Sequence, residues 1–321
     1  MAAAAVPEVV TMGRISVDLY PEQIGVPLAE VRSFAKGLGG SPTNVAVAAA
    51  RLGRHSAVIT KVGDDPFGPY CRAALRGFGV DPRWVGTDPD LRTPVAFCEL
   101  FPPDDFPLLF YREPTAPDLR IEASELDLSA LAVAPLVWTT GTGLSREPSR
   151  SATLAALDAR AGKTGITVHD LDDRPMLWPG GESHAPWARE AVARATVVVG
   201  NQAEAAVAVG EGTPREQAER LLALGPDVAI VKQGPRGVLG LAAGGEPVEV
   251  SPVGVDVVCG LGAGDAFGGA LCHALLSGWE LERVLRYANA AGAHVAARLL
   301  CADEMPTAAE VEELLAHAGA P

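Results

Sequence analysis

The sequence predicts an α/β fold: a doubly wound, mostly parallel sheet sandwiched by helices, with a small β-sheet lid. Short runs rich in Val and Ile recur along the chain, and most of them precede a helical pattern, which is typical of parallel strands covered on both faces. A glycine-rich turn near residues 259–264 leads into an apolar helix. Two strands within residues 95–111 are joined by a Pro/Asp loop, which interrupts the βα alternation and indicates the lid.

Length, charge and cysteine content limit the possible classes of protein. The 321 residues are 48% hydrophobic, so we expect one domain over 1–321, with a discontinuous lid from about 13–37 and 92–118. A formal net charge of −14 argues against a nucleic-acid partner. No apolar run approaches the roughly 18–20 residues that a membrane span needs. The five cysteines contain no Cys-x-x-Cys pair, which is typical of a reducing compartment, so we expect the cytoplasm.

The first strand is expected at residues 9–12, with Asp18 just past it. In α/β folds, ligand-binding residues collect beyond the carboxyl ends of the strands, so Asp18 is a candidate for substrate binding. A second strand is expected at 56–62, followed by a helix that runs to about Gly77.

Between these strands, a helix with clear ends follows Gly39 and Gly40. Ser41 suits the N-cap of this helix, and Gly53 suits the position just after its last turn. Asn44 then falls in the first turn. The two glycines would let a sugar approach while Asn44 bonds its hydroxyls, or the stretch is only a well-formed helix start.

The expected lid hairpin has strands at 95–101 and 108–111, and Arg112 follows it. Arginine binds carboxylate or phosphate through two parallel hydrogen bonds, so Arg112 is a candidate for substrate binding. The alternative is an exposed arginine on the lid. From residue 136 onward the βα alternation is regular, with a hairpin to about Val250 and a helix over 281–300. Strands are expected at 136–140, 166–170, 197–200 and 228–232.

The glycine-rich turn carries the chemistry that the sequence indicates most directly. Gly262, Ala263 and Gly264 lead into the first helical turn, whose N–H groups have no internal partners and so form an anion site. Asp265, in that turn, would stand beside a bound phosphate and accept a proton from an attacking hydroxyl. The alternative is that Asp265 only caps the helix. The turn lacks the Gly-Lys-Ser/Thr of a Walker A loop and lies too late in the chain for a dinucleotide fingerprint.

Taken together in order, four motifs resemble the ribokinase-like, or phosphofructokinase-B, family of carbohydrate kinases. The resemblance runs from about Val9 to the C-terminus, and it implies the fold described above. It also implies that the backbone of Gly262, Ala263 and Gly264 forms the anion hole and that Asp265 is the catalytic base. The motifs are Gly39-Gly40…Asn44, Asn201-x-x-Glu204, Lys232-x-Gly234 and Gly262-Ala263-Gly264-Asp265.

The same resemblance implies ATP and Mg²⁺. Glu204 would organise Mg²⁺, through water, because Mg²⁺ keeps much of its hydration. One departure concerns Cys259-Gly260-Leu261, which stands where most members carry Asp-Thr, so a requirement for a monovalent cation such as K⁺ is left open. The residues expected near the nucleotide are Asn201, Lys232, Gly234, Gly237 and Asn289, and those expected to hold sugar hydroxyls are Asp18, Gly39, Gly40 and Asn44.

Three further stretches, 111–113, 170–178 and 303–307, resemble the branch of the family that phosphorylates keto-deoxy sugar acids. The implied partners are ATP and a small sugar acid, most closely 5-dehydro-2-deoxygluconate, with a homodimer through the lid as a possibility. Asp170 and Arg174 join the substrate-binding candidates, and Arg112 or Arg174 would bind the carboxylate; alternatively Arg174 forms a structural salt bridge. Other possibilities are a 2-keto-3-deoxygluconate kinase, a neutral-sugar or nucleoside kinase, and a sensor without catalysis.

Overall fold

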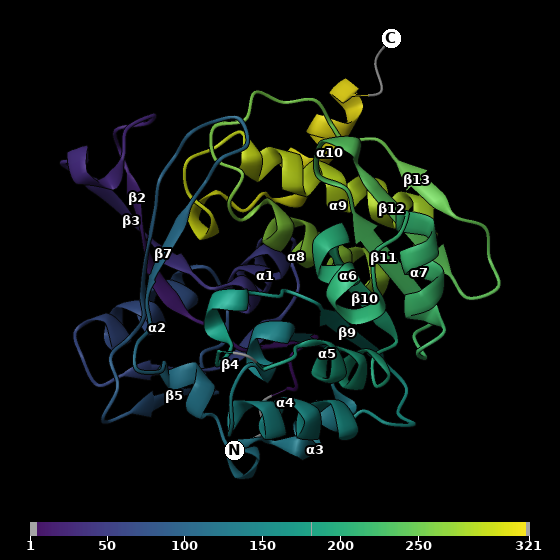
Figure 1. Ribbon diagram of the computed structural model, residues 1–321, viewed down its shortest axis with the longest axis horizontal. Helices are drawn as coiled ribbons and strands as arrows, with labels where there is room; N and C mark the ends of the chain where they lie inside the picture. Colours follow the sequence, from purple (N-terminus) through teal and green to yellow (C-terminus); the bar gives the residue numbers. More distant parts are fainter. Residues whose placement is uncertain (1–4, 181, 319–321) are drawn as a thin grey trace.

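A nine-stranded sheet with helices on both faces forms the centre of the computed structural model, which describes residues 5–180 and 182–318 (Figure 1). The strands are β1 (Val9–Met12), β4 (Ser56–Gly63), β5 (Val85–Asp88), β8 (Leu136–Thr140), β9 (Ile166–Asp170), β10 (Val197–Asn201), β11 (Val228–Lys232), β12 (Val238–Ala242) and β13 (Val248–Val250). Their order is β13-β12-β11-β10-β9-β8-β1-β4-β5. Neighbours from β11 to β5 pair in parallel, and only the β11–β12 and β12–β13 pairs are antiparallel. The predicted fold class is confirmed.

Two layers of helices cover the two faces of this sheet. One layer packs into the largest buried cluster and consists of α1 (Ser41–Arg51), α2 (Phe67–Gly77), α8 (Ala263–Leu276), α9 (Leu281–Ala296) and α10 (Ala308–Ala318). The other layer consists of α3 (Leu128–Val133), α4 (Ser149–Asp158), α5 (Ala185–Val192), α6 (Gln202–Val209) and α7 (Pro214–Leu222). Among the helices of the described residues, none combines the length and apolar character that crossing a bilayer requires.

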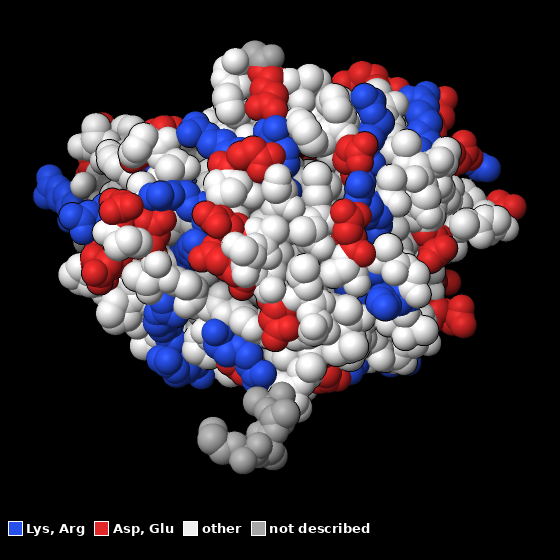
Figure 2. Space-filling view, turned by 90° about the horizontal axis from the view of Figure 1, so that it is seen from below, with Lys and Arg blue, Asp and Glu red and all other residues white. Residues whose placement is uncertain are grey.

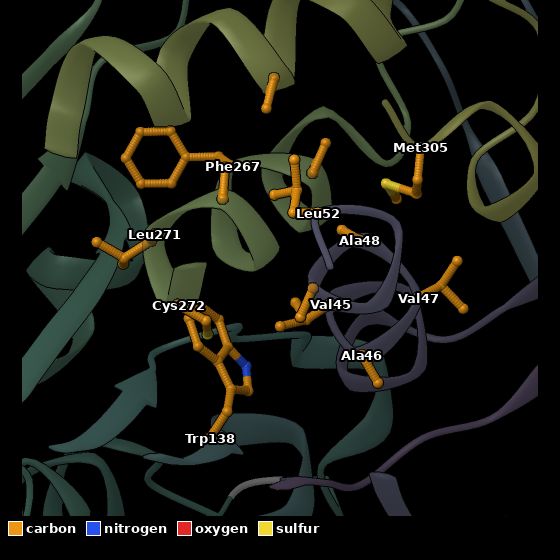
Figure 3. Close-up of a cluster of buried hydrophobic side chains, with 14 of the residues drawn as sticks. Val45, Ala46, Val47, Ala48, Leu52, Trp138, Phe267, Leu271, Cys272 and Met305 are labelled. Atoms are coloured by element: carbon orange, nitrogen blue, oxygen red, sulfur yellow. The ribbon is translucent and has the colours of Figure 1, made fainter. Parts of the chain in front are cut away.

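Glycines fix the position of α8, the helix that follows the glycine-rich turn. A Cβ at Gly268 would lie 2.8 Å from the ring of Trp138 and 2.9 Å from Val45, and a Cβ at Gly269 would clash with Ala48 of α1. Figure 3 shows Trp138 beneath α8 and Val45 on the facing turn of α1. The absence of these side chains lets α8 pack closely on α1 and on the sheet, which holds its N-terminus in a defined place.

A second sheet forms the lid at one end of the molecule (Figure 1). Its strands are β2 (Ser16–Pro21), β3 (Phe34–Gly39), β6 (Val95–Cys98) and β7 (Leu108–Tyr111), in the order β3-β2-β6-β7. The β6–β7 pair is the hairpin that the sequence predicts, and β3 continues two residues past the expected limit at 37.

Asp18 lies within β2, inside the lid segment 13–37 that the sequence predicts. Two local predictions need correction. Ser41 is the first residue of α1, and Gly40, with a φ of +100°, takes the N-cap position. The strand β5 was not expected, because its sequence, Val-Gly-Thr-Asp, has little of the Val/Ile pattern that marks the other strands.

Candidate active site

The candidate site is a cleft of about 250 Å³ at the carboxyl ends of the parallel strands. The strand order reverses beside β1, because β4 lies on one side of β1 and β8, which is much later in the chain, lies on the other. Ligands of doubly wound folds bind at such a reversal. Side chains that line the cleft follow or end β1, β9, β10 and β11, and they are Arg14, Asp170, Asp172, Asn201, Glu204 and Lys232.

The glycine-rich turn forms one wall of the cleft. Gly262 is the N-cap of α8 with a φ of +80°, and a Cβ at this position would clash with Cys301. No side chain caps the helix, so its first N–H groups are available to an anion. The Nζ atom of Lys232 lies close to the start of α8 and would be 3.5 Å from a Cβ at Gly264. The ammonium group and the helix N-terminus therefore lie together in the cleft, where both favour a bound phosphate.

Asp265 lies in the first turn of α8 and lines the same cleft. Its Oδ2 accepts a hydrogen bond of 2.8 Å from Nδ2 of Asn44 on α1. Burial raises the pKa of Asp265, while hydrogen bonds from Asn44 and Ser41 partly oppose the rise. A half-buried carboxylate with a raised pKa beside an anion site has the properties of a general base.

Acidic residues at the ends of β9 and β10 face Lys232. Burial raises the pKa of Asp170 to about 7, although the charge of Lys232 opposes this. Burial alone would lower the pKa of Lys232, but Asp170, Glu204 and Asp265 raise it, so the lysine remains charged. Asn201 and Glu204 cap α6 reciprocally, through bonds of 2.9 Å and 2.7 Å.

This donor set suits a magnesium ion that is shared with phosphates. Within residues 5–180 and 182–318, no group of three or more His, Cys, Asp or Glu side chains could hold a metal ion unaided. Mg²⁺ in kinases is bound through one or two carboxylates together with waters and substrate phosphates. Glu204 and Asp170 both line the cleft, so they could supply the one or two carboxylates that such an ion requires. Asp170, which the sequence placed among the substrate-binding candidates, would then bind the metal ion.

Asp18 reaches the cleft from lid strand β2. Ser16 donates a hydrogen bond of 2.6 Å to its Oδ1, and the hydroxyl of Tyr20 lies 3.4 Å from its Oδ2. Burial raises the pKa of Asp18 to about 6. The carboxyl group lies so close to Gly39 that a Cβ there would overlap it. The small residue at 39 therefore makes room for Asp18, and Gly40, not Gly39, lines the cleft.

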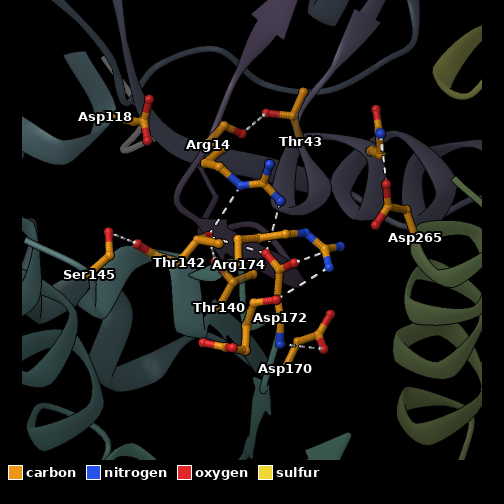
Figure 4. Close-up of polar contacts among 12 residues, drawn as sticks. Arg14, Thr43, Asp118, Thr140, Thr142, Ser145, Asp170, Asp172, Arg174 and Asp265 are labelled. Atoms are coloured by element: carbon orange, nitrogen blue, oxygen red, sulfur yellow. Dashed lines mark hydrogen bonds and ion pairs between the residues drawn. The ribbon is translucent and has the colours of Figure 1, made fainter. Parts of the chain in front are cut away.

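Two arginines share one carboxylate at the floor of the cleft. Nη2 of Arg14 lies 2.9 Å from Oδ2 of Asp172, and Nη2 of Arg174 lies 3.1 Å from Oδ1 of Asp172. Figure 4 shows both guanidinium groups converging on Asp172, with Thr142 beside them. Burial alone would raise the pKa of Asp172, but Arg14 and Arg174 hold it below its usual value. The carboxylate is therefore charged at neutral pH.

Arg112, a predicted substrate-binding residue, is not brought to this cleft. It pairs instead with Asp118 at 2.8 Å, and both side chains are buried. A guanidinium held in that position does not line the cavity that contains Asp265, so a substrate-binding role of Arg112 stays a prediction. Gly234, Gly237 and Asn289 also lie outside the cleft lining; Asn289 donates to the Ser251 carbonyl oxygen at 3.0 Å. Their expected contacts with a nucleotide stay predictions.

The sequence reasoning missed several residues that line the cleft. Arg14 comes two residues after β1, at the carboxyl end of a central strand, where ligand-binding residues collect; that signal was assigned to Asp18 instead. The others include Ser16, Tyr20, Ser41, Ala96, Leu108, Phe110, Asp172 and Cys301. Leu108 and Phe110 alternate along β7, so one face of the lid covers the cleft.

Comparison with known proteins agrees with this architecture. A model of the pfkB family carbohydrate kinases matches residues 6–308. The 5-dehydro-2-deoxygluconokinase of Bacillus licheniformis is 30% identical over 312 residues, which cover 96% of each chain. The protein of the same name from Bacillus subtilis is 30% identical over 96% of this chain and 95% of its own. A structure described as a putative ribokinase II from E. coli, in complex with ATP and Mg²⁺, has a TM-score of 0.85 at 26% identity, with 97% of this chain and 99% of that chain covered.

Proposed function

The chain belongs to the pfkB family of carbohydrate kinases, as its motifs predict, and we propose that it transfers the γ-phosphoryl group of ATP to a terminal hydroxyl of a keto-deoxy sugar acid. The observation that carries the proposal is Asp265, a carboxyl group with a raised pKa in the first turn of α8, at the open N-terminus of that helix. The substrate we favour is 5-dehydro-2-deoxygluconate, as in inositol catabolism. The names of the Bacillus relatives and the position of Arg174 in the cleft support this choice.

In the proposed reaction, the oxygen of the sugar hydroxyl attacks the γ-phosphorus of ATP. The new P–O bond forms as the bond to the β-phosphate oxygen breaks, ADP leaves, and the hydroxyl proton passes to a carboxylate oxygen of Asp265. The N–H groups at the start of α8 and the ammonium of Lys232 stabilise the charge on the transferred group. Leu108 and Phe110 of the lid exclude water, which limits hydrolysis of ATP.

Glu204 and Asp170 would hold the magnesium ion, which when bound supplies positive charge to the phosphate oxygens. A monovalent cation is not part of this proposal, because Cys259 and Leu261 offer neither the carboxylate nor the hydroxyl that most members of the family carry there.

We also propose a reducing, cytoplasmic location, which is supported by five buried cysteines without disulfides. On the face shown in Figure 2, the described basic and acidic residues are interspersed, without an extended patch of one sign.

A homodimer through the lid is a further part of the proposal. The face of β7 that points away from the cleft carries Leu109 and Tyr111, whose exposed fractions are 48% and 63%. The rings of Phe34, Phe97 and Tyr111 continue this face across the lid through edge-to-face contacts. An exposed apolar sheet face of this kind is typical of a protein–protein contact.

The substrate assignment is tested by measuring ADP release with Mg-ATP and a panel of acceptors: 5-dehydro-2-deoxygluconate, 2-keto-3-deoxygluconate, ribose, fructose and adenosine. We expect turnover with the first acid to exceed that with every other compound. Preference for 2-keto-3-deoxygluconate would keep the mechanism and change the substrate. Turnover of the neutral compounds alone would contradict a sugar-acid kinase, and inactivity with all five would favour a sensor.

The role of Asp265 is tested with Asp265→Asn. We expect turnover to fall by about 10²–10⁴, which is the usual contribution of a general base, while nucleotide binding measured by calorimetry stays near normal. The substitution preserves the shape of the side chain and its position beside Asn44. Turnover within about tenfold of the unsubstituted enzyme would show that another group accepts the proton.

A further inference from the structure

We propose that Arg14, together with Arg174, binds the carboxylate of the sugar acid and so sets the preference for acids over neutral sugars. The inference rests on the proposed function and adds a specificity-determining residue to it. Its basis is that Arg14 lines the cleft and has donor capacity to spare, although its side chain is only 8% exposed.

The donors of Arg14 divide between the protein and the cleft. Nε donates to Oγ1 of Thr142 at 3.2 Å, and Nη2 donates to Oδ2 of Asp172 at 2.9 Å. Nη1 has no hydrogen-bonding partner among the described residues, and it is not among the enclosed atoms without partners. Arginine carries five N–H donors in a planar fork, so Arg14 retains N–H groups for a ligand in the cleft.

The backbone holds Arg14 in this position. Its carbonyl oxygen accepts a hydrogen bond of 2.8 Å from Oγ1 of Thr43 on α1. A Cβ at Gly40 would clash with the same carbonyl group, so only glycine allows the start of α1 to approach it. A guanidinium fixed at both its backbone and its Nε loses little conformational entropy when it binds a ligand.

The two arginines at Asp172 leave donors for one more acceptor. Arg14 and Arg174 each make one contact with this carboxylate. The other charged partner of Arg174 is Glu204, at a longer distance of 3.6 Å, and Glu204 is a residue that we assign to the metal ion. A substrate carboxylate that accepts N–H groups from both arginines would form charge-assisted hydrogen bonds. A hydroxyl group of a neutral sugar would form weaker ones.

The test compares Arg14→Gln and Arg14→Lys with the unsubstituted enzyme, by measuring KM and kcat for two acceptors. One acceptor is 5-dehydro-2-deoxygluconate, and the other is its neutral analogue with a hydroxymethyl group in place of the carboxylate. We expect Arg14→Gln to raise KM for the acid by about ten- to a hundredfold, the range for a hydrogen bond to a charged group. We expect a change below about threefold for the neutral analogue. Arg14→Lys keeps the charge without the planar fork, so its KM for the acid should lie between that of the unsubstituted enzyme and that of Arg14→Gln.

Arg150→Gln is the matched control. Arg150 is also buried and bonds carbonyl groups, but it does not line the cleft, so both acceptors should keep their KM. In Arg14→Gln, Asp172 still has Arg174 as a charged partner, which favours folding. If the Gln variant does not fold, Arg14→Lys carries the test, because it retains a cation beside Asp172.

An equal increase in KM for the acid and its neutral analogue, or an unchanged KM for the acid, would overturn the assignment of Arg14. Either result would leave the proposal of a sugar-acid kinase in place. Failure of the proposed function is distinguishable, because the unsubstituted enzyme would then show no turnover with sugar acids at all. That result would remove both proposals.

Discussion

Two buried arginine–aspartate pairs in this molecule have almost the same length, 2.8 Å for Arg112–Asp118 and 2.9 Å for Arg14–Asp172. Within residues 5–180 and 182–318, the first pair has no third charged partner. Nε of Arg112 and Oδ1 of Asp118 are buried without a hydrogen-bonding partner among the described residues. The second pair shares its carboxylate with Arg174 and lines the cleft beside Asp265. The pairs thus differ in what surrounds them and not in their own geometry.

The difference shows how a buried ion pair can be assigned to structure or to function. Isolated buried pairs contribute little net stability, because desolvation offsets the attraction, but the loss of one partner is costly. A pair with unused donors that open into a cavity has, in addition, a place for a ligand. Arg14 meets this condition at the cleft, whereas Arg112, one of the two arginines that the sequence suggested, lines a separate hollow beside β7 that does not contain Asp265.

The largest expected effect concerns the Arg112–Asp118 pair. Asp118→Ala leaves the guanidinium of Arg112 buried and uncompensated, so we expect the free energy of unfolding to fall by ~3–5 kcal/mol. Urea unfolding followed by circular dichroism measures this. The KM for the sugar acid should stay unchanged at a temperature where the variant is folded, because neither residue lines the cleft.

A double variant, Arg112→Met with Asp118→Leu, is the control for that experiment. Replacing both charges with apolar groups of similar size removes the desolvation cost together with the attraction. We therefore expect it to regain most of the stability that Asp118→Ala loses. If the double variant is as unstable as the single one, an uncompensated charge on Arg112 is not the cause of the loss in Asp118→Ala.

Asp18 is a contrasting carboxylate, because its hydrogen-bonding partners are Ser16 and Tyr20 and not an arginine. Its contribution to stability therefore depends on pH in a different way. Burial raises the pKa of Asp18 to about 6, from an ordinary value of 3.8, so the group favours the folded state only when it is protonated. That stability is present below about pH 4 and is lost as the pH rises through about 6. Asp18→Asn should therefore raise the free energy of unfolding by up to roughly 3 kcal/mol at pH 8. The gain should disappear at pH 4.

Unfolding measured at both pH values checks this prediction. A gain that is the same at pH 4 and pH 8 would show that the charge of Asp18 is not the cause. Asp172 provides the contrast, because its arginine partners hold its pKa below the ordinary value. Its ionised form therefore stabilises the folded protein above that value, and the contribution is lost only as the pH falls through the lowered pKa.

The same contrast explains how much of the site could be predicted from sequence. The anion site and Asp265 follow one another within residues 262–265, so local signals were sufficient to place them on a helix N-terminus. The βα alternation likewise identified most strands of the main sheet. Arg14 and Asp172 are 158 residues apart, and no local pattern reports that they meet. Conversely, Asp118 follows Arg112 by six residues, but it lies in a 3-10 turn, Pro117–Arg120, that is not among the predicted elements.

The smallest expected effect concerns Asn44, the uncharged hydrogen-bonding partner of Asp265. Asn44 gives Asp265 a single hydrogen bond of 2.8 Å, whereas Arg14 and Arg174 give Asp172 charged ones. Burial raises the pKa of Asp265, and Asn44 opposes the rise, so Asn44→Ala should raise this pKa further. The base must be ionised to accept a proton, and the acid limb of kcat/KM should therefore move to higher pH. A neutral hydrogen bond contributes about 0.5–1.5 kcal/mol, so near pH 6 we expect kcat/KM of Asn44→Ala to be roughly two- to tenfold below that of the unsubstituted enzyme. This difference in kcat/KM should become smaller as the pH rises. A decrease in kcat/KM that is the same at every pH would instead assign Asn44 to substrate binding alone.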